Sequence, residues 1–291
     1  MKQVAFIISK KQTTLNPSDA LVVPLLHEHD VMVTAVPWGT NTDWSIFDMI
    51  VIRSAWDYPL RYKEFASWLN MAERQNAHVW NLASTLRWNS IKTYFATMLH
   101  NHFPTVPTRM VTDIDSIPKT FQPWTMIVVK PAVGAWAFEI KKFSEKNSRD
   151  WTSHVRRLLS QGPVLIQEYM KDICDGEYSL IFFDKKYSHA VLKKPKKNEF
   201  RTQKVYGGSI ISITPPLAAI KMSQSVLDGI PEPLLYARVD GLYIDGSFTL
   251  MEIELCAVSY THLRAHETVL DLVCRLLLET KTTSKNVVSD S

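Results

Sequence analysis

The sequence predicts a protein of mixed class, in which an α/β domain built on a parallel sheet is followed by α+β segments. Two observations predict this division. Before Pro104, short apolar runs alternate with amphipathic segments, which is the pattern of a parallel sheet covered by helices. Beyond Pro107, strand patterns cluster and helical patterns are few, which is typical of α+β structure.

The amino-terminal elements follow from apolar periodicity. Val4–Ile8 is a continuous apolar run, as expected of a strand buried on both faces. Ligands of parallel sheets usually bind at the carboxyl ends of the strands. The expected strands are Val4–Ile8, Val31–Val36, Met49–Ile52 and His78–Trp80, and the expected helices are Pro17–His29, Tyr62–Gln75 and Ser90–His100, the last capped by Asn89.

The rest of the chain is richer in strands. The expected strands are Ile127–Lys130, Val164–Gln167, Ser179–Phe183, Ser188–Val191, Leu235–Asp240 and Phe248–Glu254, and the expected helices are Ser148–Ser160 and Leu217–Leu227. Divided at these elements, the chain is expected to hold an α/β domain (1–105), two further units (106–191 and 192–256) and a tail (257–291).

Composition excludes several classes of protein. The 33 Lys and Arg residues exceed the 29 Asp and Glu residues by only four, too few to argue for a nucleic-acid partner. Three scattered cysteines without a CxxC motif fit a reducing compartment. No apolar run is long enough for a membrane span or a signal peptide. We therefore expect a soluble cytoplasmic protein.

The strongest local signal for a functional site is the acidic strand Phe248–Glu254. Glu252 and Glu254 alternate with apolar residues, so both carboxylates point to one face of the strand. Asp240 ends the preceding strand and pairs with Glu252 if the connection has a three-residue loop or a bulge. Three such carboxylates suit Mg²⁺, a hard cation that prefers oxygen ligands. A solvated sheet face that carries charges is the alternative.

Cations occur where they could meet a phosphate. Lys130 ends an apolar strand ahead of a loop, and Lys92 lies near a helix start, where an anion would be favourable. Six Lys and Arg residues lie within 193–204, just before Gly207 and Gly208. This basic run reads as a loop that closes over an anion, with a nucleic-acid patch or a solvated loop as alternatives. The alternative interpretation is that Lys92 and Lys130 are ordinary surface lysines without a phosphate partner.

Together these segments resemble the ATP-grasp superfamily, and within it the group that contains the cyclase of D-cycloserine biosynthesis and lies near prokaryotic glutathione synthetase. The resemblance covers roughly residues 1–256. The segments that carry it are Arg53–Tyr58, Arg87–Asn89 with Lys92, Val128–Pro131, Gln167–Tyr169, Ser188–Val191, Glu199–Arg201 with Tyr206–Gly208, Ala237–Asp240 and Met251–Leu255.

The resemblance implies an ATP-grasp fold and a role for each candidate residue. Lys92 and Lys130 would hold the phosphates of ATP, and Arg201 the transferring phosphoryl group. The other implied roles are the adenine pocket for Gln167, Glu168 and Tyr169, the ribose for Glu177, Mg²⁺ for Asp240, Glu252 and Glu254, and the amino-acid-like substrate for Arg53 and Asp57. Many relatives have Asn at the position of Glu254, but Glu is frequent in this group.

The implied activity is an ATP-dependent carboxylate–amine ligase or cyclase that works through an acyl phosphate. An ATP-binding module without turnover and a small-molecule kinase on the same fold remain alternatives. ATP and Mg²⁺ are the implied cofactors, with an amino-acid-like substrate, no nucleic acid and no membrane partner. Since relatives are often dimers, a homodimer is possible under this resemblance.

Two departures from the family pattern stand out. The loop after Lys130, residues 132–138, contains a single glycine, whereas the corresponding loop of the family usually has several Gly or Ser residues. The tail 257–291 reads as the in-frame translation of a sequencing adapter rather than as a native segment. His262 and His266 in it have the spacing of a metal site, but we assign them no function.

Overall fold

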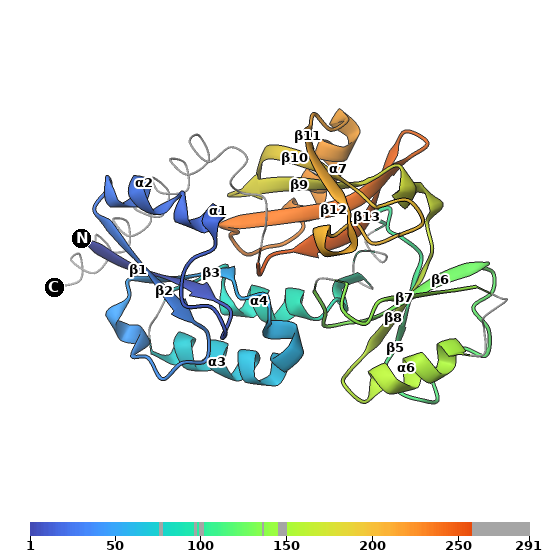
Figure 1. Cartoon of the computed structure of the whole chain (residues 1–291), viewed down its shortest axis with the longest axis horizontal. Helices are drawn as coiled ribbons and strands as arrows, with labels where there is room; N and C mark the ends of the chain where they lie inside the picture. The colour runs from blue at the N-terminus through green and yellow to red at the C-terminus, as the bar shows by residue number, and fades with distance from the viewer. Residues whose placement is uncertain (76–77, 96–97, 99–101, 136, 145–149, 258–291) are drawn as a thin grey trace.

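The computed structural model describes residues 1–257 except for 76–77, 96–97, 99–101, 136 and 145–149. The tail expected to be non-native therefore lies, apart from Ala257, outside the described residues. The described part of the chain contains three sheets: an amino-terminal sheet of four strands, a second sheet of four strands and a third sheet of five strands (Figure 1). No helix of this part of the chain combines the length and the hydropathy that crossing a membrane requires.

The amino-terminal sheet is parallel throughout, as the sequence predicted. Its strands are β1 (Lys2–Ile8), β2 (Val31–Pro37), β3 (Met49–Ser54) and β4 (Val79–Trp80), in the order β2-β1-β3-β4. One face packs on helix α3 (Tyr62–Arg74), whose Phe65 and Leu69 are fully buried. The other face packs on α2 (Val23–His27) and on the five-stranded sheet, so β1 and β3 are buried on both sides.

Two helix predictions were wrong in part, for identifiable reasons. The segment 17–29 forms two short helices, α1 (Pro17–Ala20) and α2, because Pro24 cannot donate the backbone hydrogen bond of a helix interior and starts a new helix. Asn89 does not cap a helix that starts at Ser90; of the expected helix 90–100, Tyr94, Phe95 and Met98 are helical, and 96–97 and 99–100 lie outside the described residues. Asn89 lies in the last turn of α4 (Ala83–Ser90), and its side chain bonds the main chain of the acidic strand.

The second sheet is antiparallel, with the order β5-β8-β6-β7. Its strands are β5 (Thr108–Val111), β6 (Met126–Pro131), β7 (Lys141–Ser144) and β8 (Val164–Glu168). Helix α6 (Trp151–Leu159) covers one face through Trp151, Val155 and Leu158. The sequence did not predict β5 and β7, which are short edge strands with one buried residue each.

The third sheet runs β11-β10-β9-β12-β13 and is also antiparallel. Its strands are β9 (Glu177–Phe183), β10 (Lys186–Lys194), β11 (Ser209–Ile213), β12 (Tyr236–Ile244) and β13 (Ser247–Glu254), and α7 (Leu217–Asp228) packs on it. Short 3₁₀ helices lie at Trp44–Ile46, Tyr58–Arg61, Lys171–Cys174 and Lys204–Tyr206. The expected boundary at 191/192 falls inside β10, so the sheets favour a division between β8 and β9.

The amino-terminal sheet and the five-stranded sheet are joined by buried amide side chains. Asn81 donates to the carbonyl oxygens of Tyr236 and Leu255, and its own oxygen accepts from the backbone N–H of Leu235 at 2.7 Å. Asn89 bonds Ile253 and Leu255 in the same way. These bonds satisfy main-chain groups beyond the sheet ladders, so they fix where the acidic strand ends.

We expect Asn81→Ala to lower the free energy of unfolding by about 2–4 kcal/mol, because three buried backbone groups lose their partner. Urea denaturation followed by fluorescence measures this. Asn70→Ala on the exposed face of α3 is the control and should change stability by less than about 0.5 kcal/mol. Similar losses in the two variants would show that the buried amide does not hold the sheets together.

Candidate functional site

The hairpin of β12 and β13 places the acidic side chains. Its turn has two residues, Asp245 and Gly246, both at positive φ. The register shifts between Asp240 and Gly241, and this bulge sets Asp240 opposite Glu252, which confirms the predicted pairing. A Cβ on Gly241 would lie 2.5 Å from the Phe248 ring and the Thr249 oxygen, so only glycine fits beside the shift.

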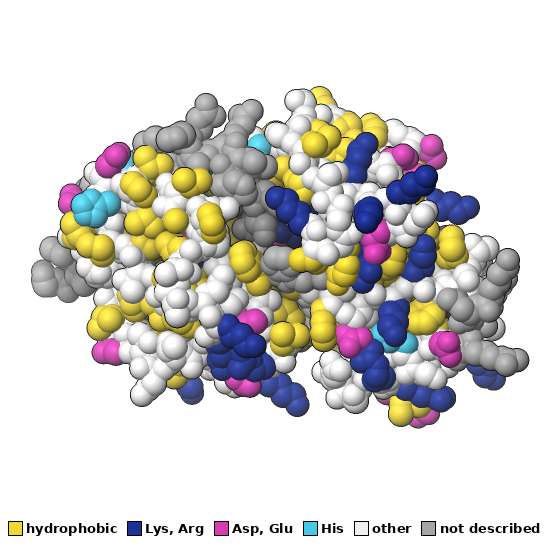
Figure 2. Space-filling view, in the orientation of Figure 1, with side chains coloured by type: hydrophobic (Ala, Val, Ile, Leu, Met, Phe, Trp, Pro, Cys, Tyr) yellow, Lys and Arg dark blue, Asp and Glu magenta, His cyan; other side chains and the backbone are white. Residues whose placement is uncertain are grey.

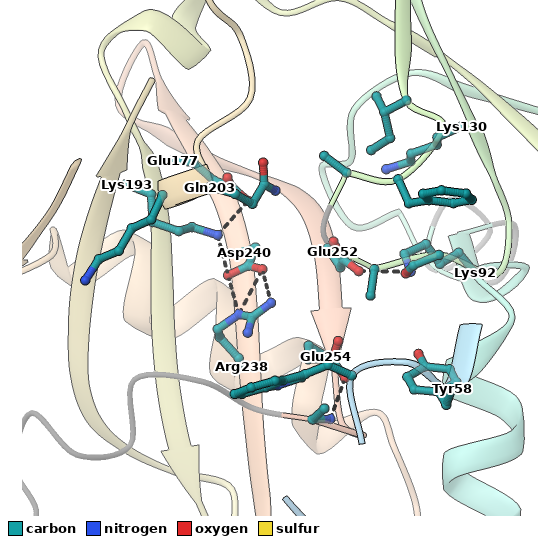
Figure 3. Close-up of a pocket in the computed structure, with 18 of the residues that line it drawn as sticks. Tyr58, Lys92, Lys130, Glu177, Lys193, Gln203, Arg238, Asp240, Glu252 and Glu254 are labelled. Carbon is teal, nitrogen blue, oxygen red and sulfur yellow. Dashed lines mark hydrogen bonds and ion pairs between the residues drawn. The ribbon is translucent and has the colours of Figure 1, made fainter. Parts of the chain in front are cut away.

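The three carboxylates line one cavity of about 320 Å³ together with Lys92 and Lys130 (Figure 3). Asp240 is 1% exposed, accepts from Ser179 Oγ, and lies 2.9 Å from the Arg238 guanidinium. Glu254 accepts from the backbone N–H groups of residues 256 and 257. Among the described residues, no three Asp, Glu, His or Cys side chains lie close enough together to form a metal site.

The electrostatics of the acidic residues are set by their neighbours. Burial raises the pKa of Asp240, but Arg238 and Lys193 outweigh it and hold the pKa at about 2. Burial likewise opposes ionisation of Glu252, while Lys92 and Lys130 lower its pKa. Both carboxylates are therefore ionised at neutral pH, the form in which they accept hydrogen bonds and bind cations.

The opposite wall of this cavity carries the two predicted lysines (Figure 3). Lys130 is the last residue but one of β6 and is buried, which lowers its pKa to about 8 despite the nearby carboxylates. Lys92 is also buried; its Nζ donates to the carbonyl oxygen of Gly134 at 2.8 Å and lies 3.0 Å from Glu252 Oε1. The lysines and acids predicted from sequence thus lie together around one cavity.

The loop after β6, which contains a single glycine, is held in place by side-chain contacts. Ala137 and Glu139 both have positive φ, an uncommon conformation outside glycine. Both guanidinium nitrogens of Arg157, on α6, donate to the Glu139 carboxylate, and His154 Nε2 donates to the Glu139 carbonyl oxygen at 3.0 Å. The loop still lines the cavity, through Gly134, Ala135, Ala137 and Phe138.

A second cavity of about 110 Å³ adjoins the first and shares Lys130, Glu177 and Glu252 with it. It is lined by all the residues predicted to meet adenine and ribose, namely Gln167, Glu168, Tyr169 and Glu177. Met251, which was expected on the apolar face of the acidic strand, lines this cavity instead. The bulge explains the difference, because it leaves Met251 unpaired between two paired positions.

Arg201 lines this second cavity rather than the first. Its guanidinium lies 3.6 Å from the centre of the Tyr206 ring and pairs with Glu199 at 2.7 Å. Glu177 is buried and bonds Thr202 Oγ1 at 2.7 Å and Lys193 Nζ at 3.0 Å. The segment that follows β10 therefore contributes residues to both cavities.

The two predicted substrate residues are separated. Arg53 lines the first cavity, where it forms a buried ion pair with Asp19 at 2.6 Å. Asp57 is not among the described residues that line either cavity. Its carboxylate accepts from Trp38 Nε1 at 2.7 Å and lies 3.4 Å from Arg61, so it holds the fold of its own loop.

Three cavity residues were missed in the sequence. Arg238 precedes Asp240 by two positions and so shares its strand face, a signal that alternation could have provided. Lys193 was counted only within the basic run, although it is 6% exposed in β10 while Lys194 is exposed. Asp19 carries no sequence signal, because its role depends on the distant Arg53.

Comparison with known proteins agrees with this geometry. A family model described as the N-terminal domain of the D-cycloserine synthetase DcsG matches residues 4–81. The cycloserine biosynthesis protein DcsG of Streptomyces lavendulae is 32% identical over 267 residues, which cover 84% of this chain and 88% of that protein. A solved structure of D-cycloserine synthetase DcsG has a TM-score of 0.82 at 21% identity, covering 94% of this chain and 99% of that chain.

More distant structures share the fold. D-alanine–D-alanine ligase from Bacillus anthracis, solved with ATP, has a TM-score of 0.67 at 14% identity, covering 98% of this chain and all of that chain (100%). The ATP-grasp ligase PsnB, solved with a minimal precursor, Mg and ADP, has a TM-score of 0.61 at 14% identity, covering 96% and 98% of the two chains. The expected ATP-grasp fold is confirmed, and the chain belongs to the DcsG family of the ATP-grasp superfamily.

Proposed function

We propose that this protein is an ATP-dependent carboxylate–amine ligase or cyclase that activates an amino-acid-like substrate as an acyl phosphate. The observation that carries the proposal is that one cavity is lined by both groups of charges. Asp240, Glu252 and Glu254 lie on one side of it, and Lys92 and Lys130 lie on the other. Phosphoryl transfer needs positioned opposite charges more than covalent catalysis, and this cavity supplies them. Kinship with DcsG and with ATP-dependent ligases supports the same activity.

The second cavity is the proposed site of the nucleoside. It is small, bounded by apolar side chains such as Ile173 and Met251, and edged by the end of β8. Glu177 lies where the two cavities meet, a position suited to ribose hydroxyls. Burial, with a smaller effect of Cys174, raises the pKa of Tyr169 to about 12, so its hydroxyl remains protonated at neutral pH.

The first cavity is the proposed site of the phosphates and of Mg²⁺. The donor set fits the ion, because Asp240 and Glu252 present hard carboxylate oxygens from directly paired strand positions. Among the described residues, Glu254 does not group with these two carboxylates into a three-residue site, so phosphate and water oxygens would complete the coordination. Bound there, Mg²⁺ would neutralise the phosphate charge that develops during transfer.

The residues of this chain would divide the reaction between them. A substrate carboxylate oxygen attacks the terminal phosphorus of ATP, forming the acyl phosphate and releasing ADP. Lys130 and Arg238 would stabilise the transferring oxygens from opposite walls of the cavity, with Arg201 nearer to the nucleoside. A substrate amine then attacks the acyl carbon and expels inorganic phosphate. The loop pinned through Glu139 would exclude water from the acyl phosphate.

The substrate would lie at the end of the first cavity away from the nucleoside. Arg53, Asp19, Trp56 and Tyr58 line that end, and all come from the amino-terminal domain. A buried ion pair offers a guanidinium to a carboxylate and a carboxylate to an amine, the two groups of an amino acid. Asp57 has no part in this proposal, because its contacts lie outside the cavity.

The decisive experiment measures ADP release in the presence of amino-acid-like substrates, with hydroxylamine as a trap. We expect substrate-dependent ADP formation and a hydroxamate, since hydroxylamine captures only an activated acyl group. ADP formation with a stable phosphorylated product would instead indicate a kinase. Tight ATP binding without ADP from any substrate would indicate a binding module without turnover.

Replacing Glu252 by Gln should lower kcat by about 100-fold or more, because the cavity loses a charged oxygen ligand on the strand that faces the phosphates. Glu28→Gln, an exposed position outside both cavities, is the matched control and should keep full activity. Initial rates of ADP release at saturating ATP give the comparison. Equal rates for the two variants would remove Glu252 from the reaction.

Lys130 makes nucleotide binding depend on pH. Burial lowers its pKa from an ordinary 10.5 to about 8, and a bound polyphosphate would favour the ammonium form and raise it again. At pH 8, ATP binding should therefore take up about half a proton, and affinity should fall as pH rises above 8. Calorimetry in two buffers of different ionisation enthalpy measures this uptake.

The matched variant is Lys130→Arg, whose guanidinium stays charged throughout this range. It should bind nucleotide at pH 9 about as well as at pH 7, with no proton uptake at pH 8. If the wild type and this variant take up the same number of protons, a group other than Lys130 is responsible.

A further inference from the structure

Three acidic side chains of the first cavity, Glu177, Asp240 and Glu252, lie beside lysines of the protein itself. Lys193 Nζ lies 3.0 Å from Glu177 Oε1 and 3.5 Å from Asp240 Oδ1, so it bridges two carboxylates (Figure 3). Lys92 Nζ lies 3.0 Å from Glu252 Oε1. Both lysines are only 6% exposed, so these contacts are shielded from water.

The carboxylates of this cavity are outnumbered by cations of the protein. Its lining, among the described residues, contains five carboxylates (Asp19, Glu177, Asp240, Glu252 and Glu254) and six cations (Arg53, Lys92, Lys130, Lys193, Lys204 and Arg238). A divalent ion that entered alone would add two positive charges to a lining that already carries an excess of positive charge, which is unfavourable. A divalent ion that entered with a polyphosphate would bring its own compensating negative charge.

The two lysines can make way for such an ion where the arginine cannot. A lysine ammonium is a compact charge on a flexible stem, so it can leave a carboxylate for a phosphate within a few ångströms. Arg238 instead holds Asp240 through a planar guanidinium, with Nε 3.0 Å from each carboxylate oxygen. Lys92 is also bonded to the Gly134 carbonyl, which keeps its ammonium beside the loop that borders the phosphates.

We propose that Lys92 and Lys193 are resident counter-ions of the carboxylates, so that divalent metal binds this protein only together with a polyphosphate. The proposal rests on the proposed function, because it assigns the same carboxylates to the metal. It gives Lys193 a positioning role that the resemblance to ATP-grasp proteins did not assign here. Since linkage is reciprocal, nucleotide and metal must raise each other's affinity by the same factor.

The test measures Mn²⁺ binding to the nucleotide-free protein, from the electron paramagnetic resonance signal of the unbound ion. We expect Lys193→Met and Lys92→Met to bind Mn²⁺ at least about tenfold more tightly than the wild type, because each frees a carboxylate from its ammonium. Lys194→Met is the control. It removes the neighbouring charge from the exposed face of β10 and should bind Mn²⁺ like the wild type.

Thermal melting supplies a second readout for variants that lose stability. Because Lys193→Met leaves Glu177 and Asp240 without their shared cation, Mn²⁺ should raise its melting temperature while leaving that of the wild type unchanged. Lys92→Met tests the same point on the other wall. Equal Mn²⁺ affinity in the wild type and both lysine variants would overturn the proposal.

The same titrations with ADP separate this proposal from the proposed function. If ADP with Mg²⁺ binds the wild type while metal affinities are equal in all variants, only the counter-ion role fails. If ADP binds none of the proteins with or without metal, the proposed function fails as well. Calorimetric titration of ADP at saturating Mg²⁺ gives this result.

Discussion

The candidate site depends on one backbone feature, the bulge between Asp240 and Gly241. A two-residue turn alone would pair Asp240 with Met251 and send its carboxylate to the opposite face of the sheet. The extra residue on β13 restores Asp240 to the face of Glu252, and Met251 lines the second cavity. Gly241 is required there because the Phe248 ring and the Thr249 oxygen occupy the space of a side chain.

The charges around this bulge are collected from distant parts of the chain. Asp240, Glu252 and Arg238 come from the β12–β13 hairpin, Lys130 from the second sheet, and Lys92 from the segment after α4. On the face shown in Figure 2, most Lys and Arg side chains lie over the two antiparallel sheets, with acidic and apolar groups between them. The basic side chains that define the candidate site are therefore those that converge on the first cavity from separate parts of the chain.

Elements with strong periodicity and residues with local signals could be predicted from the sequence. The parallel sheet, helix α3 and the Asp240–Glu252 pairing all followed from alternation or turn geometry. Prediction failed where tertiary contacts decide. Asn89 resembled a helix cap, but its side chain bonds the acidic strand β13. The strands β5 and β7 are held by their neighbouring strands rather than by an apolar pattern of their own. Lys193 is distinguished from Lys194 only by the face of β10 that it occupies.

The ion pair between Glu139 and Arg157 has a mechanical consequence. Since Arg157 belongs to α6, and α6 packs on the sheet that carries Lys130, the loop that lines the first cavity and one of the lysines of that cavity are attached to the same small sheet. A movement of this small sheet relative to the acidic hairpin would therefore carry the loop and Lys130 together.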